Sequence, residues 1–334
     1  MKIGITFDLK SSSPSAPDAP DDAQEEYDSP QTIEAIATVL RGKGHSVVLL
    51  GDGREFVEKV LAEKPDLVFN FAEGHGISRS REARVPAVLE MLGIAYTGSD
   101  PFTLAVTLDK VCAKTLVAAA GVRVPAGWAL DGGAPISSIP LKSLPFPLLI
   151  KPAWEGSSKG IRNRCLVERP EEVAGVVEAL RRDHPQTILV EEYIAGDEIT
   201  VGVHGNDDPQ VLGTLRVAPR VPTDRFVYSL EVKRNWRGNI GFECPPALPA
   251  QTLDAIGQAA RTAFRTLACR DIARIDFRLR GGVPYFLEVN PLPGLHPVDS
   301  DLVILAGLSG WSYERLVWTI VEHALSRLSR RRQP

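Results

Sequence analysis

The chain has 334 residues, enough for two or three domains that each bury a core. Hydrophobic residues make up 44% and charged residues 24%, which is typical of a globular protein, and the net charge of −4 argues against a nucleic-acid partner. No apolar run approaches the roughly 18 residues of a membrane span, and no apolar leader follows Met1. Four scattered cysteines without a Cys-x-x-Cys pair indicate free thiols in a reducing cytoplasm rather than a zinc site.

Strands and helices alternate in the first part of the chain. Apolar strands are predicted at residues 2–8, 46–50 and 67–71, and amphipathic helices at 31–42, 54–63 and 84–92. This order predicts a small parallel sheet covered by helices, which ends as a first domain at residue 98. Residues 9–30 are rich in Ser, Pro, Asp and Glu and are expected to form a mobile loop.

The rest of the chain is predicted to form two α+β lobes, residues 99–188 and 189–334. The smaller lobe is expected to hold a helix at 101–121, strands at 147–151 and 163–167, a helix at 170–182 and a strand at 187–192 that leads into the last lobe. The last lobe is expected to hold strands at 198–204 and 210–217, a helix at 250–269, a hairpin at 273–289 and a helix at 313–328.

The predicted hairpin carries three oxygen ligands. Asp276 lies on its first strand, Glu288 and Asn290 at the end of its second, and Gly281-Gly282 supplies the turn. Hard oxygen donors at one strand end suit Mg²⁺, especially where phosphate oxygens complete the octahedron. Arg274, two residues before Asp276, lies on the same face and could meet a developing anion. On its own, the pattern is more typical of an ordinary hairpin with solvated charges, and it is the apolar residues around the acids and the stretches upstream that favour a metal site.

Two further stretches suggest a nucleotide. Lys151 ends an apolar strand directly before a loop of small residues (155–160, EGSSKG) whose backbone N–H groups could cradle a phosphate, although the Walker spacing is absent. Residues 191–194 followed by Glu198 offer a strand edge for a flat heterocycle and an acid for a ribose. Alone, the first is also compatible with a hairpin turn and the second with a plain strand. Lys110 and Lys233 are further candidate phosphate ligands, although most lysines are solvated.

Four stretches in one order carry a family resemblance: LEMLGIAYTGSD…LDKVCAK, KPAWEGSSKGI, VEEYIAGDEITV and ARIDF…YFLEVNPLPGL. They resemble the ATP-grasp superfamily and, within it, D-alanine–D-alanine ligase and its relatives. The resemblance implies an ATP-grasp fold, an α/β first domain followed by two lobes that clamp ATP. It also implies a cytoplasmic, homodimeric ligase that joins a carboxylate to an amine through an acyl phosphate and releases ADP and phosphate.

The resemblance also implies roles for individual residues. Two Mg²⁺ ions, for which Mn²⁺ can substitute, would be held by Asp276, Glu288 and Asn290. The catalytic residues would be Arg274, Gly294, Lys233 and Ser158, with Arg274 and the Gly294 N–H stabilising the tetrahedral intermediate and Lys233 reaching the γ-phosphate from a lid at 218–238. The implied ATP contacts are Lys110, Lys151, Glu155, Ser157, Ser158, Glu191, Glu192, Ile194, Glu198 and Lys233.

The substrate-binding stretches depart from the family pattern. Tyr27 stands where the family has a glutamate for the first substrate's ammonium, so Glu26 or Asp28 would have to replace it. The turn after His75 is basic and contains Arg79 and Arg81, which could hold an additional carboxylate. Acids flank Ser300, and Arg234 follows Lys233 where the family has a tyrosine. The candidate substrate residues are Glu26, His75, Arg79, Arg81, Ser300 and Asp301.

These departures favour a ligase whose substrates differ from two D-alanines. Three alternatives remain: an authentic D-alanine–D-alanine ligase, an ATP-grasp ligase for a peptide or another amine, and an ATP-binding protein without turnover. The expected partners are small molecules, with neither nucleic acid nor membrane among them.

Overall fold

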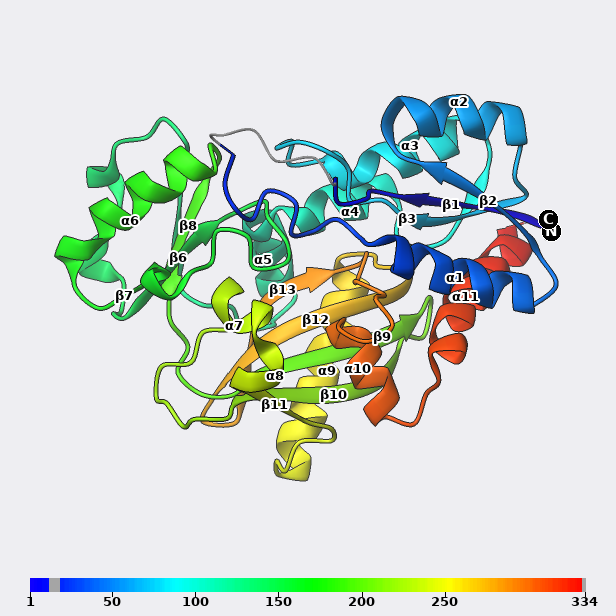
Figure 1. Cartoon of the computed structure of the whole chain (residues 1–334). Helices are drawn as coiled ribbons and strands as arrows, with labels where there is room; N and C mark the ends of the chain where they lie inside the picture. The colour runs from blue at the N-terminus through cyan, green and yellow to red at the C-terminus, as the bar shows by residue number, and fades with distance from the viewer. Residues whose placement is uncertain (12–18, 332–334) are drawn as a thin grey trace.

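A computed structural model describes residues 1–11 and 19–331, which form three sheets with covering helices (Figure 1). The N-terminal sheet has the order β2-β1-β3-β4, with every pair parallel. Its strands are β1 (Lys2–Phe7), β2 (Ser46–Gly51), β3 (Leu67–Phe71) and β4 (Ala95–Tyr96). The predicted parallel sheet is therefore confirmed.

Helices cover both faces of this sheet (Figure 1). One face packs on α1 (Pro30–Gly42) and the C-terminal α11 (Tyr313–Arg331), the other on α2 (Gly53–Glu63) and α3 (Arg84–Met91). Helix α1 begins where Ser29 accepts a hydrogen bond from the Thr32 N–H, with Pro30 in the first turn. Because α11 closes the face of the first sheet, the two ends of the chain share one core.

The helix predicted at residues 101–121 is two helices, α4 (Pro101–Leu108) and α5 (Lys110–Ala119). Asp109 separates them, with an extended backbone (φ −83°, ψ 99°) and a side chain that accepts the N–H groups of Val111 and Cys112. Asp109 is thus the N-cap of α5, which places Lys110 at the first position of the new helix.

The central sheet has the order β5-β8-β6-β7 and only antiparallel pairs among the described strands. It contains β5 (Gly127–Leu130), β6 (Leu148–Pro152), β7 (Leu166–Val167) and β8 (Ile188–Glu192), covered by α6 (Pro170–Asp183). The strand predicted at 163–167 is correct only for its last two residues, because residues 163–165 form a 3-10 turn. Strand β8 belongs to this sheet. The boundary between the two lobes was expected after residue 188, and we propose to move it to follow Glu192.

The C-terminal sheet has the order β11-β10-β9-β12-β13. It contains β9 (Glu198–Gly205), β10 (Gln210–Pro219), β11 (Ile240–Glu243), β12 (Asp271–Arg280) and β13 (Val283–Asn290). Helix α9 (Ala250–Thr266) packs with α5 on one face, and α10 (Asp301–Leu308) packs with α11 on the other. Two short helices, α7 (Leu230–Arg234) and α8 (Trp236–Asn239), lie between β10 and β11 and form the lid.

Part of the expected mobile loop is firmly packed. Residues 19–29 run over the central lobe, where Asp22 and Glu26 are buried, while residues 12–18 lie outside the described part of the chain. Asp22 accepts the Gly160 N–H at 2.9 Å. Within residues 1–11 and 19–331 we find no helix with the length and hydropathy needed to cross a bilayer.

Candidate active site

Three adjoining cavities lie between the central sheet, the C-terminal sheet and the lid, and Arg274 lines all three. The inner cavity, between β6, β8 and the hairpin, contains Lys151 and Glu198. The middle cavity contains Lys110 and Asn290. The outer cavity opens between residues 25–29, the lid and residues 294–301. The structure thus brings the ends of β6, β8 and β13 together with the middle of β12, as the sequence predicts.

The hairpin β12–β13 places its acidic residues opposite one another. Asp276 pairs in register with Glu288, and Arg274 with Asn290. The Asp276 carboxylate accepts the Thr200 hydroxyl at 2.8 Å on one oxygen and Arg274 NH2 at 3.0 Å on the other. The Asn290 Oδ1 accepts the Leu292 N–H at 2.9 Å, which fixes the amide.

The two carboxylates differ in their charge environment. Although burial opposes ionisation, Lys110 and Lys151 hold the pKa of Glu288 at about 2. Burial and the charge of Glu288 raise the pKa of Asp276, and the nearby charge of Arg274 only partly offsets this effect. A second carboxylate beside an ionised one is stabilised by a bound cation, so this pair fits a divalent metal.

Three buried lysines lie at or near the inner and middle cavities. Lys110 Nζ lies 3.1 Å from Glu288 and also donates to the Glu155 carbonyl oxygen. Lys151 Nζ lies 2.7 Å from Glu191, whose other oxygen pairs with Lys114. Glu191 therefore neutralises two lysines, which differs from the expected contact with an adenine amine. Lys114 was not predicted, although it lies four residues after Lys110 on the same helix.

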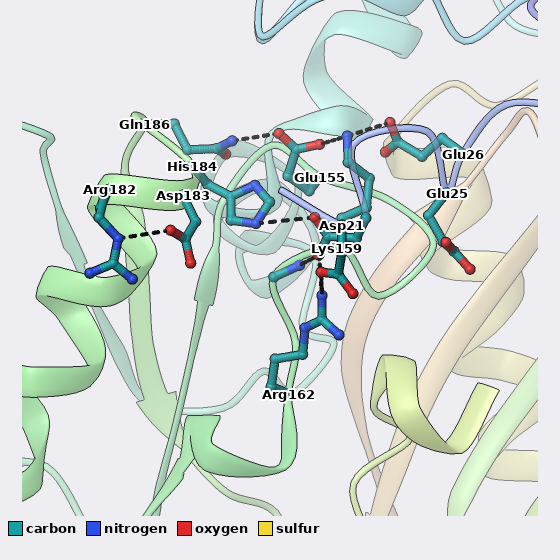
Figure 2. Close-up of polar contacts among 12 residues, drawn as sticks. Asp21, Glu25, Glu26, Glu155, Lys159, Arg162, Arg182, Asp183, His184 and Gln186 are labelled. Atoms are coloured by element: carbon teal, nitrogen blue, oxygen red, sulfur yellow. Dashed lines mark hydrogen bonds and ion pairs between the residues drawn. The ribbon is translucent and has the colours of Figure 1, made fainter. Parts of the chain in front are cut away.

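The small-residue loop has a strained backbone and a different use for its acid. Ser157 and Ser158 adopt positive φ of 48° and 59°, where non-glycine residues are uncommon. The Ser158 hydroxyl donates to the Tyr228 carbonyl at 3.0 Å, which ties the loop to the lid. Glu155 accepts Gln186 at 2.7 Å and Lys159 at 2.5 Å (Figure 2). In this structure the Glu155 carboxylate clamps the loop, and its expected contact with ATP stays a prediction.

The groups expected around the base and ribose are partly engaged. The Glu192 carboxylate accepts the Ala126 N–H at 2.9 Å and Arg280 at 2.8 Å. Glu198 pairs with Arg278 at 2.9 Å, and Arg278 also donates to the Ile194 carbonyl at 2.6 Å. Arg278, which the sequence reasoning missed, thus organises this end of the inner cavity from inside β12.

The lid lysine faces the cavities. Lys233 lines the inner and outer cavities with its Nζ 4.9 Å from the centre of the Tyr228 ring, and it takes part in none of the ion pairs between described residues. Arg234, where the family has a tyrosine, pairs with Asp21 at 2.8 Å and Glu25 at 3.0 Å. The lid therefore carries one cation inward and uses the next to hold the N-terminal segment.

At the far end of the outer cavity the chain is tightly packed. A Cβ at Gly294 would lie 2.9 Å from the Ser300 hydroxyl, which accepts the His296 N–H at 2.9 Å. Asp301 accepts the Tyr228 hydroxyl at 3.1 Å and lies 3.6 Å from Arg274. Asp301 therefore belongs to the network around Arg274.

Several predicted substrate residues are engaged elsewhere. Glu26 is buried and accepts Arg81 on both oxygens at 2.8 Å, together with the Gly156 N–H. It also accepts Lys159 at 3.1 Å (Figure 2). Burial alone would raise the pKa of Glu26, but the charges of Arg81 and Lys159 hold it below its ordinary value. In this structure Glu26 and Arg81 are each other's counter-ions, whereas the sequence suggested that Glu26 binds an ammonium and Arg81 a carboxylate; those substrate contacts stay predictions.

The other residues of the basic turn lie at the surface. Arg79 is 65% exposed, lies 3.8 Å from Asp109 and is absent from the lining of the three cavities, so its expected role in a substrate pocket stays a prediction. His75 is 58% exposed, with Nε2 3.1 Å from Asp8, and is absent from the lining of the three cavities. Its ring meets the edge of the Tyr27 ring at 4.8 Å.

Two acids, Asp28 and Glu73, face the outer cavity, and neither forms an ion pair with another residue of the described chain. Burial above all, against a weaker effect of Lys10, raises the pKa of Asp28 to about 7. Burial and the carboxylates of Glu82 and Glu26 raise the pKa of Glu73 well above its ordinary value. Asp28 was one of the two expected replacements for the family's glutamate. Glu73 was missed, although an acid two residues beyond an entirely buried strand is a recognisable signal.

Comparison with known proteins places this arrangement. The family model described as D-ala D-ala ligase C-terminus matches residues 136–322. The D-alanine–D-alanine ligase of Moorella thermoacetica is 33% identical over 87% of this chain and 92% of its own length. The uncharacterized protein y4sG of Sinorhizobium fredii is 31% identical over 88% and 87%.

Solved structures agree on the fold. The D-alanine–D-alanine ligase of Bacillus anthracis, complexed with ATP, superposes with a TM-score of 0.77 at 23% identity over 99% of both chains. The VanG D-Ala:D-Ser ligase of Enterococcus faecalis gives a TM-score of 0.72 at 22% identity over 97% of this chain and 99% of its own. The chain therefore belongs to the D-alanine–D-alanine ligase family and is an ATP-dependent ligase with the ATP-grasp fold.

Proposed function

We propose that this protein joins the carboxylate of one amino acid to the amine of a second through an acyl phosphate. The observation that carries the proposal is the facing pair Asp276 and Glu288, with Arg274 between them and two buried lysines behind. These acids and Asn290 are suited to hold Mg²⁺ ions, which neutralise phosphate charge and align the γ-phosphate when bound. Two ions are expected, and Mn²⁺ is a reasonable substitute.

The chain's own groups account for the remaining chemistry. Lys110, Lys151 and the lid's Lys233 are placed to bind phosphate oxygens as a substrate carboxylate oxygen attacks the γ-phosphorus and ADP leaves. The amine of the second substrate then attacks the acyl carbon, loses a proton, and phosphate leaves. Arg274 and the Gly294 N–H are the proposed donors to the oxyanion of the tetrahedral intermediate. The lid excludes water, which would hydrolyse the acyl phosphate.

Substrate amines are the proposed partners of Asp28 and Glu73. Both acids face the outer cavity, and an ammonium would stabilise their ionised forms. The family's single glutamate for the first ammonium is thereby replaced by two acids from different loops, and Asp301 adds a third at the far end. We therefore propose a pair of substrates other than two D-alanines, of which at least one is larger or carries a further amine.

The alternatives keep one supporting observation each. The names of the similar ligases favour D-alanine for both substrates. The acids around the outer cavity favour an amine on a peptide or another molecule.

The homodimer and the cytoplasmic location stay predictions. Light scattering of the purified protein would measure its oligomeric state.

Phosphate release from ATP, measured against a panel of D- and L-amino acids singly and in pairs, tests the proposal. We expect release that depends on substrate, with a diamino or otherwise larger amino acid giving the highest kcat/KM. If D-alanine alone gives the highest value, the substrate proposal is wrong while the ligase stands. If no amine stimulates release although ATP binds, the catalytic proposal itself is wrong.

A further inference from the structure

Three metal-binding side chains converge in the N-terminal domain, away from the cavities described above. Asp8, Asp52 and His75 each place a ligand atom within 4.8 Å of the other two. Asp8 directly follows β1, Asp52 follows β2, and His75 lies four residues beyond β3. Since β1 lies between β2 and β3 and all are parallel, the three side chains meet at the carboxyl end of the sheet, where such sheets bind ligands.

A buried oxygen points into this cluster without a donor. Asp8 is 2% exposed, and its Oδ1 has no hydrogen-bond partner among residues 1–11 and 19–331. Its other oxygen accepts the Gly74 N–H at 2.9 Å, which fixes the carboxylate with Oδ1 toward the cluster. His75 Nε2 approaches that Oδ1 to 3.1 Å without making a hydrogen bond. A buried carboxylate oxygen without a donor is costly unless a cation satisfies it.

The spacing fits two ligands of one ion. Ligands about 2.1 Å from a metal and adjacent in its coordination shell are about 3.0 to 3.4 Å apart, depending on whether the shell is octahedral or tetrahedral. The separation of 3.1 Å between Oδ1 and Nε2 lies in this interval. One imidazole with two carboxylates suits a first-row divalent ion such as Zn²⁺ better than Mg²⁺, which prefers oxygen alone.

We propose that Asp8, Asp52 and His75 form a Zn²⁺ site separate from the Asp276–Glu288 pair. Three protein ligands leave a position for water, and the half-buried Asp52 and the exposed His75 give an ion access from solvent. The ion would tie together the loops after β1, β2 and β3. It would also fix His75 against Tyr27, which lines the outer cavity. The site does not depend on the proposed substrates.

Calorimetric titration of the tag-free, chelator-treated full chain with ZnCl₂, in excess Mg²⁺ and without nucleotide, tests the site. We expect one tight equivalent for the wild type and at least tenfold weaker binding for His75→Gln and Asp52→Asn. Two controls should keep wild-type affinity. Asp276→Asn alters the ligase site, and His323→Gln removes another close imidazole pair, in which His204 Nδ1 and His323 Nε2 are 2.9 Å apart.

Thermal unfolding with and without Zn²⁺ gives a second readout. Zn²⁺ should raise the melting temperature of the wild type and of both controls, and leave His75→Gln and Asp52→Asn unchanged. Absence of Zn²⁺ binding by the wild type would mean that Asp8 and Asp52 only share a proton. Equal binding by His75→Gln would place the ion elsewhere. Either result overturns the proposal.

Discussion

Among single residues, Asp276 and Glu288 carry most of the proposed chemistry, because they face one another across the hairpin at the point where the lysines converge. Replacing either with its amide, Asp276→Asn or Glu288→Gln, removes a negative ligand and leaves its neighbouring cations uncompensated. We expect turnover to fall by at least about 100-fold, since one metal contact contributes several kcal/mol to the transition state. Circular dichroism should show an intact fold.

The matched control for this experiment is Glu243→Gln, which alters an exposed carboxylate of the same sheet that pairs with Arg216. Its phosphate release should stay within about twofold of the wild type, because exposed ion pairs contribute at most ~1 kcal/mol. Near-normal turnover in either hairpin variant would show that the pair does not hold the catalytic metal.

Asp28 gives the protein a pH dependence whose sign can be worked out. Its pKa is about 7 in the folded chain against an ordinary 3.8, so between these values the folded protein holds a proton that the unfolded chain lacks. The unfolding free energy therefore decreases as pH rises from 5 to 8. With allowance for solvent around a half-buried carboxyl, the contribution is about 2 kcal/mol.

Urea unfolding at pH 5 and pH 8 measures this contribution. Asp28→Asn should lose less stability than the wild type between the two pH values, whatever its absolute stability. Parallel loss in both proteins would show that Asp28 titrates normally, and it would remove the reason to regard this acid as awaiting an ammonium.

At the level of elements, the lid is a pair of short helices held by several side-chain contacts. Ser229 caps α7, the Ser158 hydroxyl binds the Tyr228 carbonyl, and Arg234 pairs with Asp21 and Glu25. We expect Mg·ATP to slow proteolytic nicking of residues 218–238, because the γ-phosphate gives Lys233 its partner. Equal rates with and without nucleotide would count against Lys233 as a phosphate ligand.

Arg234→Ala should speed nicking of the lid several-fold without nucleotide, since it removes the contact between lid and N-terminal segment. Arg237→Ala is the control, because Arg237 pairs with Asp299 on the exposed side of the same lid. If both variants are nicked at the same rate, Arg234 does not hold the lid.

The elements themselves were largely predictable, and the reasons for the failures are local. Periodicity located the first parallel sheet and the hairpin because each buries one face or both. The helix 101–121 was predicted as continuous because both halves are apolar. It is broken because Asp109 adopts an extended backbone and caps the second helix with its side chain. Strand β8 was expected to lead into the last lobe, but it pairs with β5 and β6 of the central sheet. This pairing joins residues that are distant in sequence, so local periodicity did not reveal it.

The positions of the candidate site residues were predictable where a motif places them on a strand. They were not predictable where the direction of a loop side chain determines its partner. Asp276, Glu288 and Lys151 sit on strands, so their placement followed from register. Glu26 and Asp28 lie in one loop, and spacing alone could not tell that the first turns toward Arg81 while the second faces the outer cavity. Arg81 looked like a free cation because its counter-ion is 55 residues away in the sequence.

For the whole molecule, Glu26 is the residue that joins the parts. From the segment 19–29 it binds Arg81 of the N-terminal domain. It also binds Lys159 of the central lobe (Figure 2). Because all three groups are buried, Glu26→Gln leaves two cations short of a counter-ion, although Glu155 still lies near both. We expect a loss of about 3 kcal/mol in the unfolding free energy, the scale found when one partner of a buried ion pair is removed.

Glu25→Gln is the neighbouring control, because Glu25 is half-buried and pairs with the exposed Arg234, so its loss should cost at most ~1 kcal/mol. Burial opposes the ionisation of Glu26, yet the two cations keep its pKa in the folded chain below the ordinary 4.5. Its contribution to the unfolding free energy is therefore fully present above pH 4.5 and is lost as the pH falls through the lower pKa of the folded state. The difference between wild type and Glu26→Gln should therefore be constant from pH 6 to 8 and shrink at acidic pH. A difference that stays constant down to pH 3, or a Glu26→Gln protein as stable as Glu25→Gln, would show that the lobes are held together by their apolar contacts and not by this ion-pair network.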